Sequence, residues 1–184
     1  MGLDVVAYSE AEIVPEHCFG VTNDGYLVKY CPDNNEVQTD HIMASGIHMQ
    51  STLGVILGTC YDVSGSEHPY HMRAGSYSSY GGWRNDLSET MLGISAAEVW
   101  ENQYAYSRKP FYELINFSDC DGVIGFIAAQ NLLKDFLDNH DKYIELHSND
   151  QDINYDCQEW NIMKYEEWTN IFRTASEGGL VLFC

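Results

Sequence analysis

Seven residues between positions 73 and 84 could together bind a small anion, because they combine guanidinium, hydroxyl and aromatic groups around a glycine-rich turn. The segment reads RAGSYSSYGGWR. Glycines let backbone N–H groups approach a ligand closely, and a helix that starts beyond the turn would point its positive end at an anion. Arginine presents paired donors that match phosphate or carboxylate oxygens. The predicted ligand-binding residues are Arg73, Ser76, Tyr77, Ser78, Tyr80, Trp83 and Arg84.

The rings of this segment could stack on a planar base, which suggests a nucleotide-like ligand. The same residues also have a purely structural interpretation. Their spacing matches neither the Walker A loop nor the dinucleotide-binding fingerprint. In the structural interpretation the aromatic rings pack in the core and the arginines pair with the many carboxylates of the chain. The two interpretations differ in the exposure that they require of the rings and the guanidinium groups.

A second candidate site is the SDCDG motif at residues 118–122, which follows an expected strand and precedes an expected helix. Asp119 and Asp121 could hold a divalent cation, and Cys120 near a helix N-terminus could ionise and act as a nucleophile. These three residues are the candidate catalytic residues of an alternative function, a metal- or cysteine-dependent hydrolase or transferase. The structural interpretation is helix capping by Ser118 or an aspartate, with Cys120 buried, and it is favoured here.

The histidines and cysteines form no recognised metal-binding pattern. HExxH, CxxC and zinc-finger spacings are missing from the sequence, so no metal is predicted and no cofactor is indicated. The six cysteines lie far apart, which is typical of reduced thiols rather than of a disulfide framework. No secretory signal and no apolar run of membrane-spanning length are found. These features predict a cytoplasmic protein that does not contact a membrane.

The charge balance disfavours direct nucleic-acid binding. The chain has 28 acidic and 9 basic residues and a net charge of -19, whereas backbone contact to a nucleic acid needs clustered lysine and arginine. The basic residues are unevenly placed. Residues 1–72 hold ten acidic residues and one basic residue, residues 73–110 hold four of each, and residues 111–184 hold fourteen and four. The middle segment is therefore locally neutral, as expected of a region that binds an anion.

The acidic residues themselves suggest a third function. Residues 135–167 contain ten acidic and two basic residues, enough to cover one face of a helix with carboxylates. Such a face could act as a decoy that imitates DNA and captures a basic host protein. More often an acidic face of this kind only keeps a protein soluble. A basic host protein is thus an alternative partner to the small anionic ligand.

The pattern of apolar residues predicts a single domain over residues 1–184 with an α+β fold. We expect strands at 3–9, 25–30, 53–63, 70–77, 111–117 and 180–183. We expect helices at 79–92, 95–106, 123–140 and 156–177, and an irregular segment at 33–52. Because strands dominate the first part and helices the second, the sheet should be mainly antiparallel, with helices packed on one face.

Three segments carry a resemblance that spans most of the chain in order. They are MGLDVVAYS at the start, AGSYSSYGGWR in the middle and PFYELINFSDCDGVIG later. Together they resemble an uncharacterised family of small bacterial and phage-borne proteins with the motifs GLDxxAYS, GSYSGYNxWR and ELIxFSDCEGxIG. The family ends in an aromatic-rich helix and a Gly-Gly strand, here WTNIFRTASEGGLVLF. The chain departs from the pattern at Gly81-Gly82, where the family tends to have asparagine and a variable residue.

The resemblance implies an accessory or host-interaction role, such as the sequestering of a signal used in host defence, and it implies no established activity. The leading hypothesis is therefore a cytoplasmic α+β protein that binds a small anionic, nucleotide-like ligand. The expected cleft lies between the Arg73–Arg84 segment and the Ser118–Gly122 turn.

Overall fold

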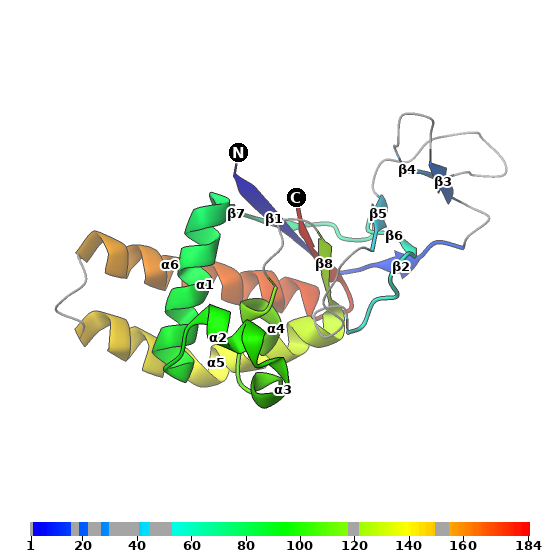
Figure 1. Cartoon of the computed structure of the whole chain (residues 1–184). Helices are drawn as coiled ribbons and strands as arrows, with labels where there is room; N and C mark the ends of the chain where they lie inside the picture. Colours follow the sequence, from blue (N-terminus) through cyan, green and yellow to red (C-terminus); the bar gives the residue numbers. More distant parts are fainter. Residues whose placement is uncertain are drawn as a thin grey trace.

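A computed structural model describes residues 2–15, 19–21, 27–29, 41–44, 53–117, 122–149 and 155–184. The strands are β1 (Leu3–Tyr8), β2 (Glu12–Ile13), β3 (Phe19–Val21), β4 (Leu27–Lys29), β5 (His41–Met43), β6 (Cys60–Asp62), β7 (Tyr70–Gly75), β8 (Gly122–Gly125) and β9 (Leu180–Phe183). The helices are α1 (Tyr77–Leu92), α2 (Ala96–Glu101), α3 (Gln103–Tyr106), α4 (Tyr112–Ile115), α5 (Phe126–Asn149) and α6 (Tyr155–Ala175). Figure 1 shows these elements in their arrangement.

Four strands form the central sheet in the order β7–β1–β9–β8, and each neighbouring pair is antiparallel. The two ends of the chain thus meet in the middle of the sheet, where Val5 of β1 pairs with Phe183 of β9. Side chains alternate along these strands, as the two-residue period of a strand requires. One set, which includes Val5 and Phe183, belongs to the main apolar core, and the other set, which includes Leu180, belongs to a second core.

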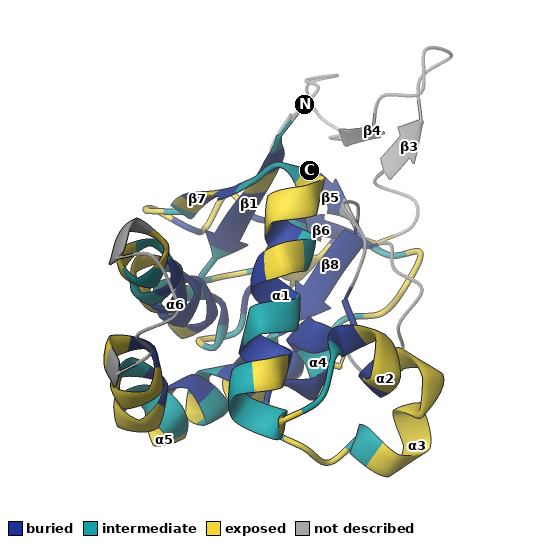
Figure 2. Ribbon diagram, turned by 60° about the vertical axis from the view of Figure 1, so that its left-hand side comes forward, coloured by how far each residue is buried: buried dark blue, intermediate teal, exposed yellow. Residues whose placement is uncertain are grey.

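The two cores lie on opposite faces of the central sheet. On one face α1, α5 and α6 pack against the strands, and their buried residues face the sheet (Figure 2). On the other face, Tyr61 of the small sheet of order β2–β6–β5 and Val63, which directly follows β6, pack with Val123 and Leu180. The predicted α+β class, a mainly antiparallel sheet with helices on one face, is confirmed.

Several predicted elements are found where the sequence places them. The strands β1, β7 and β9 fall within the segments expected to be strands, and α6 follows the expected helix closely. The helix expected from residue 79 begins at Tyr77 because Ser76 caps it: its hydroxyl accepts a hydrogen bond from the Ser79 backbone N–H at 3.1 Å. It ends at Gly93, whose φ of 73° is the left-handed conformation that glycine adopts readily at a helix end.

The strand expected at residues 111–117 is wrong. This segment forms the short helix α4, and Tyr112, Leu114 and Ile115 are all buried. Its entry residue Phe111 has a φ of 61°, and its ring is completely buried in the main core. Aromatic and β-branched residues favour a strand locally, but burial of successive apolar side chains suits a turn of helix packed against α1 and α5.

The helix expected from residue 123 is also partly wrong. Residues 122–125 form β8, and the helix α5 starts at Phe126. All residues of β8 are buried, with Ile124 in the main core and Val123 in the second core. A strand buried on both faces has a continuous apolar sequence, which local periodicity cannot distinguish from a buried helix.

The early segments differ from expectation in extent. Of the strand expected at 53–63, only Cys60–Asp62 is a strand, and Leu27–Lys29 is the strand within 25–30. The expected irregular segment 33–52 contains β5, while residues 33–40 and 45–52 lie outside the described residues. Among the helices described, none combines the length and the apolar character that crossing a bilayer requires.

Candidate functional site

The seven residues predicted from the RAGSYSSYGGWR segment divide into a surface group and a buried group. Arg73 lies on β7 at the edge of the central sheet, and its Nη1 is 2.9 Å from both carboxylate oxygens of Asp4 on β1. Tyr77 and Ser78 are exposed in the first turn of α1, beside the half-buried cap Ser76. The guanidinium of Arg73 is therefore engaged with a neighbouring strand at the surface.

The buried group comprises Tyr80, Trp83 and Arg84, which are 3%, 2% and 5% exposed. The Tyr80 hydroxyl donates to the Phe117 carbonyl at 2.8 Å, and Arg84 Nη1 donates to the Ile115 carbonyl at 2.7 Å. Protein covers the faces of the Tyr80 and Trp83 rings, so in this structure neither ring has a face on which a ligand could stack. These contacts hold α1 against the segment that leads into residues 118–121.

The Arg84 guanidinium lies between two aromatic rings. Its central carbon is 4.9 Å from the centre of the Tyr80 ring and 5.1 Å from that of Trp100. Cation–π attraction and the hydrogen bond to Ile115 offset part of the free energy needed to bury this charge. Arg73 and Arg84 thus occupy different environments, one exposed at a sheet edge and one inside the core.

The candidate catalytic residues Asp119, Cys120 and Asp121 lie outside the described residues. Gly122, which ends their motif, is the first residue of β8. Within the ranges that the structure describes, no group of three or more His, Cys, Asp and Glu side chains is placed to hold a metal ion.

A basic cleft lies elsewhere, between the segment that joins α3 to α4 and the first half of α5. Its volume is about 290 Å³. The residues that line it, and that define the basic cleft below, are Ser107, Arg108, Lys109, Pro110, Glu113, Asn131, Lys134 and Asp135. Three basic and two acidic side chains therefore meet in one cavity.

The backbone at Phe111 helps to shape this cleft. A φ of 61° is uncommon for a residue with a side chain, and it needs support from the surroundings. The Phe111 N–H donates to Asp135 Oδ2 at 2.8 Å, and the ring packs edge-on against Phe136 at 5.0 Å between centres. Because Asp135 and Phe136 are adjacent on α5, this one helix holds both the backbone and the ring of Phe111. Residues 108 and 109 are thereby kept beside α5.

The two carboxyl groups of the cleft are less acidic than usual. Burial raises the pKa of Glu113, and a hydrogen bond from Asn131 opposes the rise, while the nearby Asp135 adds to it. Burial also raises the pKa of Asp135, against the hydrogen bond from Phe111 and the charge of Lys134. Both groups consequently take up protons at higher pH than exposed carboxyl groups do.

The three basic residues of the cleft differ in whether their side chains already form an ion pair. Lys134 forms an ion pair with Asp138 one turn further along α5. Arg108 and Lys109 are exposed, and among the described residues no ion pair involves either side chain. These two side chains can therefore turn towards an anion without breaking an existing ion pair.

The locally neutral charge of residues 73–110 predicts an anion-binding region, but the predicted site contains only two of the four basic residues of that segment. Arg108 and Lys109 are two of the four basic residues in the locally neutral segment 73–110. Arg73 and Arg84 are the predicted pair because glycines and aromatic residues surround them in the sequence. An adjacent Arg-Lys pair followed by proline is a plain surface-loop signal, and it would have indicated the exposed cations.

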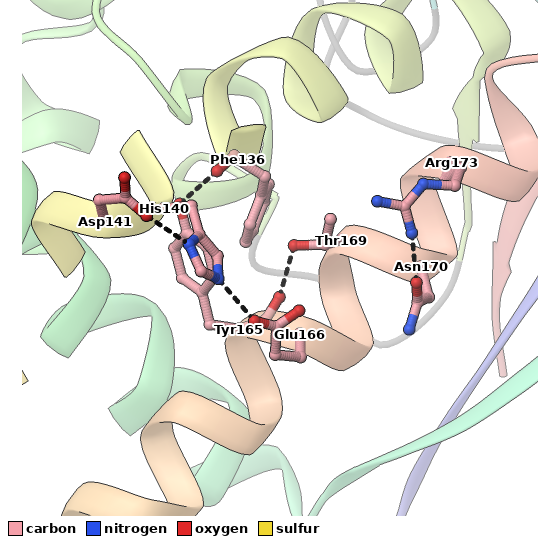
Figure 3. Close-up of polar contacts among 8 residues, drawn as sticks. All are labelled: Phe136, His140, Asp141, Tyr165, Glu166, Thr169, Asn170 and Arg173. Carbon is pink, nitrogen blue, oxygen red and sulfur yellow. Dashed lines mark hydrogen bonds and ion pairs between the residues drawn. The ribbon is translucent and has the colours of Figure 1, made fainter. Parts of the chain in front are cut away.

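A polar contact between α5 and α6 is formed by His140 (Figure 3). Its Nδ1 is 3.0 Å from Asp141 Oδ1 and its Nε2 is 2.6 Å from Glu166 Oε1. Tyr165 lies beside the ring, with 6.1 Å between ring centres. The hydrogen bonds to Asp141 and Glu166 raise the pKa of His140, because they favour the protonated ring, which donates from both nitrogens.

The stability of the protein is expected to depend on pH through His140. Since its pKa in the folded state lies above the value of about 6.5 in an unfolded chain, the protonated ring stabilises the fold below that pH. This contribution is lost as the pH rises through the folded-state pKa. His140→Gln should therefore destabilise the protein more at pH 6 than at pH 8.5, as measured by urea unfolding. His71→Gln, at an exposed position on β7, is the control; an equal loss for His140→Gln at both pH values would contradict the prediction.

No protein-family model matches the chain, and neither a curated protein nor a solved structure is found to match it.

Proposed function

We propose that the protein binds a small anionic ligand of the phosphate or phosphate-ester class in the basic cleft. The observation that carries the proposal is the convergence of Arg108, Lys109 and Lys134 on one cavity in a chain that has 9 basic residues and a net charge of -19. Charges more than about 8–10 Å away are screened at physiological ionic strength. The local set of basic groups therefore decides whether an anion is attracted, more than the net charge of the protein.

The chemistry of the lining residues supports this class of ligand. Arginine offers two parallel N–H donors to phosphate oxygens, and lysine adds a point charge. The cavity volume of about 290 Å³ is just below the range for small-molecule pockets, roughly 300–1,000 Å³. This size suits a single phosphate ester, up to about a mononucleotide, better than a dinucleotide. Glu113 and Asp135 can accept hydrogen bonds from hydroxyl groups of such a ligand.

The test is calorimetric titration with pyrophosphate and with AMP at low salt. We expect both probes to bind, and Arg108→Ala to weaken binding by about tenfold, which corresponds to about 1.4 kcal/mol for a lost charged contact. Arg73→Ala is the matched control, since it removes an exposed arginine of equal charge at the site that the sequence predicts. Lys109→Ala and Lys142→Ala form a second such pair, in which Lys142 is exposed on α5 outside the cleft. Failure of both probes to bind, or equal losses within a pair, would overturn the proposal.

A nucleotide is the narrower form of the proposed ligand, and sequestering of a defence signal is the role that the family resemblance implies. Tighter binding of AMP than of pyrophosphate would support the nucleotide. Incubation with Mg²⁺ or Mn²⁺, followed by denaturation, then separates the two classes of function. Intact AMP would support sequestration, whereas converted AMP would favour the hydrolase or transferase alternative.

A further inference from the structure

A second surface, independent of the basic cleft, lies on the α5–α6 helix pair. The two helices run antiparallel and side by side at one end of the molecule (Figures 1 and 2). Tyr165 of α6 stacks on Tyr143 of α5 with 4.2 Å between ring centres, and it also packs against Phe136. These buried rings fix the two helices to each other, so that their outward faces form one continuous surface.

The first half of α6 carries an apolar groove on this surface. Its volume is about 540 Å³, and it is lined by Glu159, Trp160, Ile162 and Met163. Met163 is 47% exposed, and Trp160 is half-buried with its inner side against the main core. A flexible methionine beside a partly buried tryptophan can adapt to apolar side chains of different shapes. The groove can therefore accept apolar side chains from another molecule.

Glu159 lines the groove, and further exposed carboxylates, which together with it are called the acidic rim, lie along both helices. On α6, Glu159, Met163 and Glu166 are exposed, and their spacing of four and three residues puts them on one face. On α5, Asp138, Asp141 and Glu145 are exposed with spacings of three and four, and they also share a face. The two acidic rows meet at His140, whose ring nitrogens contact Asp141 and Glu166.

Few basic side chains offset this charge on the same helix segments. Lys142 is exposed on α5, whereas Lys164 is buried and pairs with Glu167. An acidic rim beside an apolar groove is complementary to a helix with one apolar stripe and basic residues beside it. A second copy of this chain would bring carboxylates against carboxylates, because each copy has a net charge of -19. Charge complementarity thus selects a basic partner over self-association.

We propose that the groove of α6, together with the acidic rows beside it, binds a basic amphipathic helical segment of a partner protein. Apolar residues spaced three and four apart on that segment insert beside Trp160 and Met163. Its lysine or arginine residues face the carboxylates of the rim. The apolar contacts provide specificity, and the carboxylates accelerate the encounter and make it sensitive to salt.

The probe is a fluorescently labelled 14-residue peptide of leucine and lysine, arranged so that the leucines form one helical stripe. A peptide of the same composition with the leucines scattered is the control for non-specific charge attraction. Fluorescence anisotropy should show binding of the striped peptide at least about tenfold tighter than of the scattered one. Equal binding of the two peptides would overturn the proposal, because charge attraction alone would then explain the binding.

Variants of the protein test where the peptide binds. Met163→Ser should weaken binding of the striped peptide by about tenfold, the scale of a central apolar contact. The control is Ile56→Ser, which removes an apolar side chain that is 58% exposed in the loop before β6. Asp141→Asn combined with Glu145→Gln should weaken binding at low salt and make it less sensitive to added salt. Binding that is unchanged by Met163→Ser, or that is lost equally with Ile56→Ser, would overturn the assignment of the groove.

Discussion

Replacing Trp168 with alanine is expected to lower the free energy of unfolding by about 3–5 kcal/mol, the usual loss when a large buried aromatic residue is truncated. Trp168 is 1% exposed, and its ring stacks on Trp83, Phe172 and Phe183, with centres 5.6, 5.7 and 5.8 Å away. It thereby connects α6 with α1 and with the central strand β9. The substitution removes these contacts and leaves a cavity that the surrounding elements can fill only in part.

Urea unfolding followed by circular dichroism measures this effect, since the change in midpoint gives the difference in unfolding free energy. Met163→Ala on the same helix is the matched control, because this methionine is 47% exposed. Met163→Ala should lower the free energy of unfolding by less than about 1 kcal/mol, as is usual for surface positions. A loss below 1 kcal/mol for Trp168→Ala would mean that the aromatic cluster does not connect the sheet to the helices as described.

The elements with strong local patterns could be predicted from the sequence. Residues 160, 168, 171, 172 and 175 recur with the helical period and are expected to form the buried face of this helix; the last four are buried on α6, and Trp160 is partly buried against the main core. The apolar residues of β1 and β9, with β-branched residues among them, predicted strands that are found in the middle of the sheet. In these segments local propensity and tertiary packing favour the same structure, so the local pattern is sufficient.

The segments 111–117 and 122–125 could not be predicted because tertiary contacts override their local preference. Phe111 adopts a left-handed backbone conformation that depends on Asp135, a partner 24 positions away. Gly125 ends β8 where a side chain would collide with the Leu53 backbone, since a Cβ would lie 2.3 Å from the Leu53 carbonyl oxygen. Asp135 and Leu53 both lie far along the sequence from the residues that they contact. Patterns within a short stretch of sequence therefore cannot find the short helix or the strand.

The candidate site illustrates the same limit. The pattern that predicted α1 is the four-residue spacing of Trp83, Leu87 and Met91, of which Trp83 and Leu87 are buried and Met91 is partly buried against the main core. This spacing indicates that Trp83 is buried, but it does not separate the buried Tyr80 from Tyr77, which lies three residues earlier and is 45% exposed. It does not indicate that Arg84 is buried, because arginine is rarely buried unless it has partners. Its contacts with Ile115, Tyr80 and Trp100 are formed only in the folded chain.

Asp86 on α1 holds a buried polar cluster, and its replacement by alanine is expected to have the second large effect on stability. Its Oδ2 accepts a hydrogen bond from the Tyr143 hydroxyl at 3.0 Å and lies 3.0 Å from His147 Nε2. Burial, and then the Asp86 carboxylate, raise the pKa of Tyr143, so this phenol remains protonated and donates to Asp86. His147 is 2% exposed and stacks on Tyr143, with 4.1 Å between ring centres.

Asp86→Ala removes the acceptor that these two groups of α5 share, and each buried donor that loses an acceptor costs about 1–3 kcal/mol. We therefore expect a loss of about 2–4 kcal/mol in the free energy of unfolding. Asp86→Asn is the matched variant, since it keeps the shape of the side chain and one acceptor oxygen but loses the charge. Its loss should be smaller, because one of the two contacts can persist. If urea unfolding gave Asp86→Ala and Asp86→Asn the same loss, the carboxylate charge would explain the effect, rather than the shape of the side chain or its remaining acceptor oxygen. A loss below 1 kcal/mol for both would show that the cluster contributes little to the packing of α1 against α5.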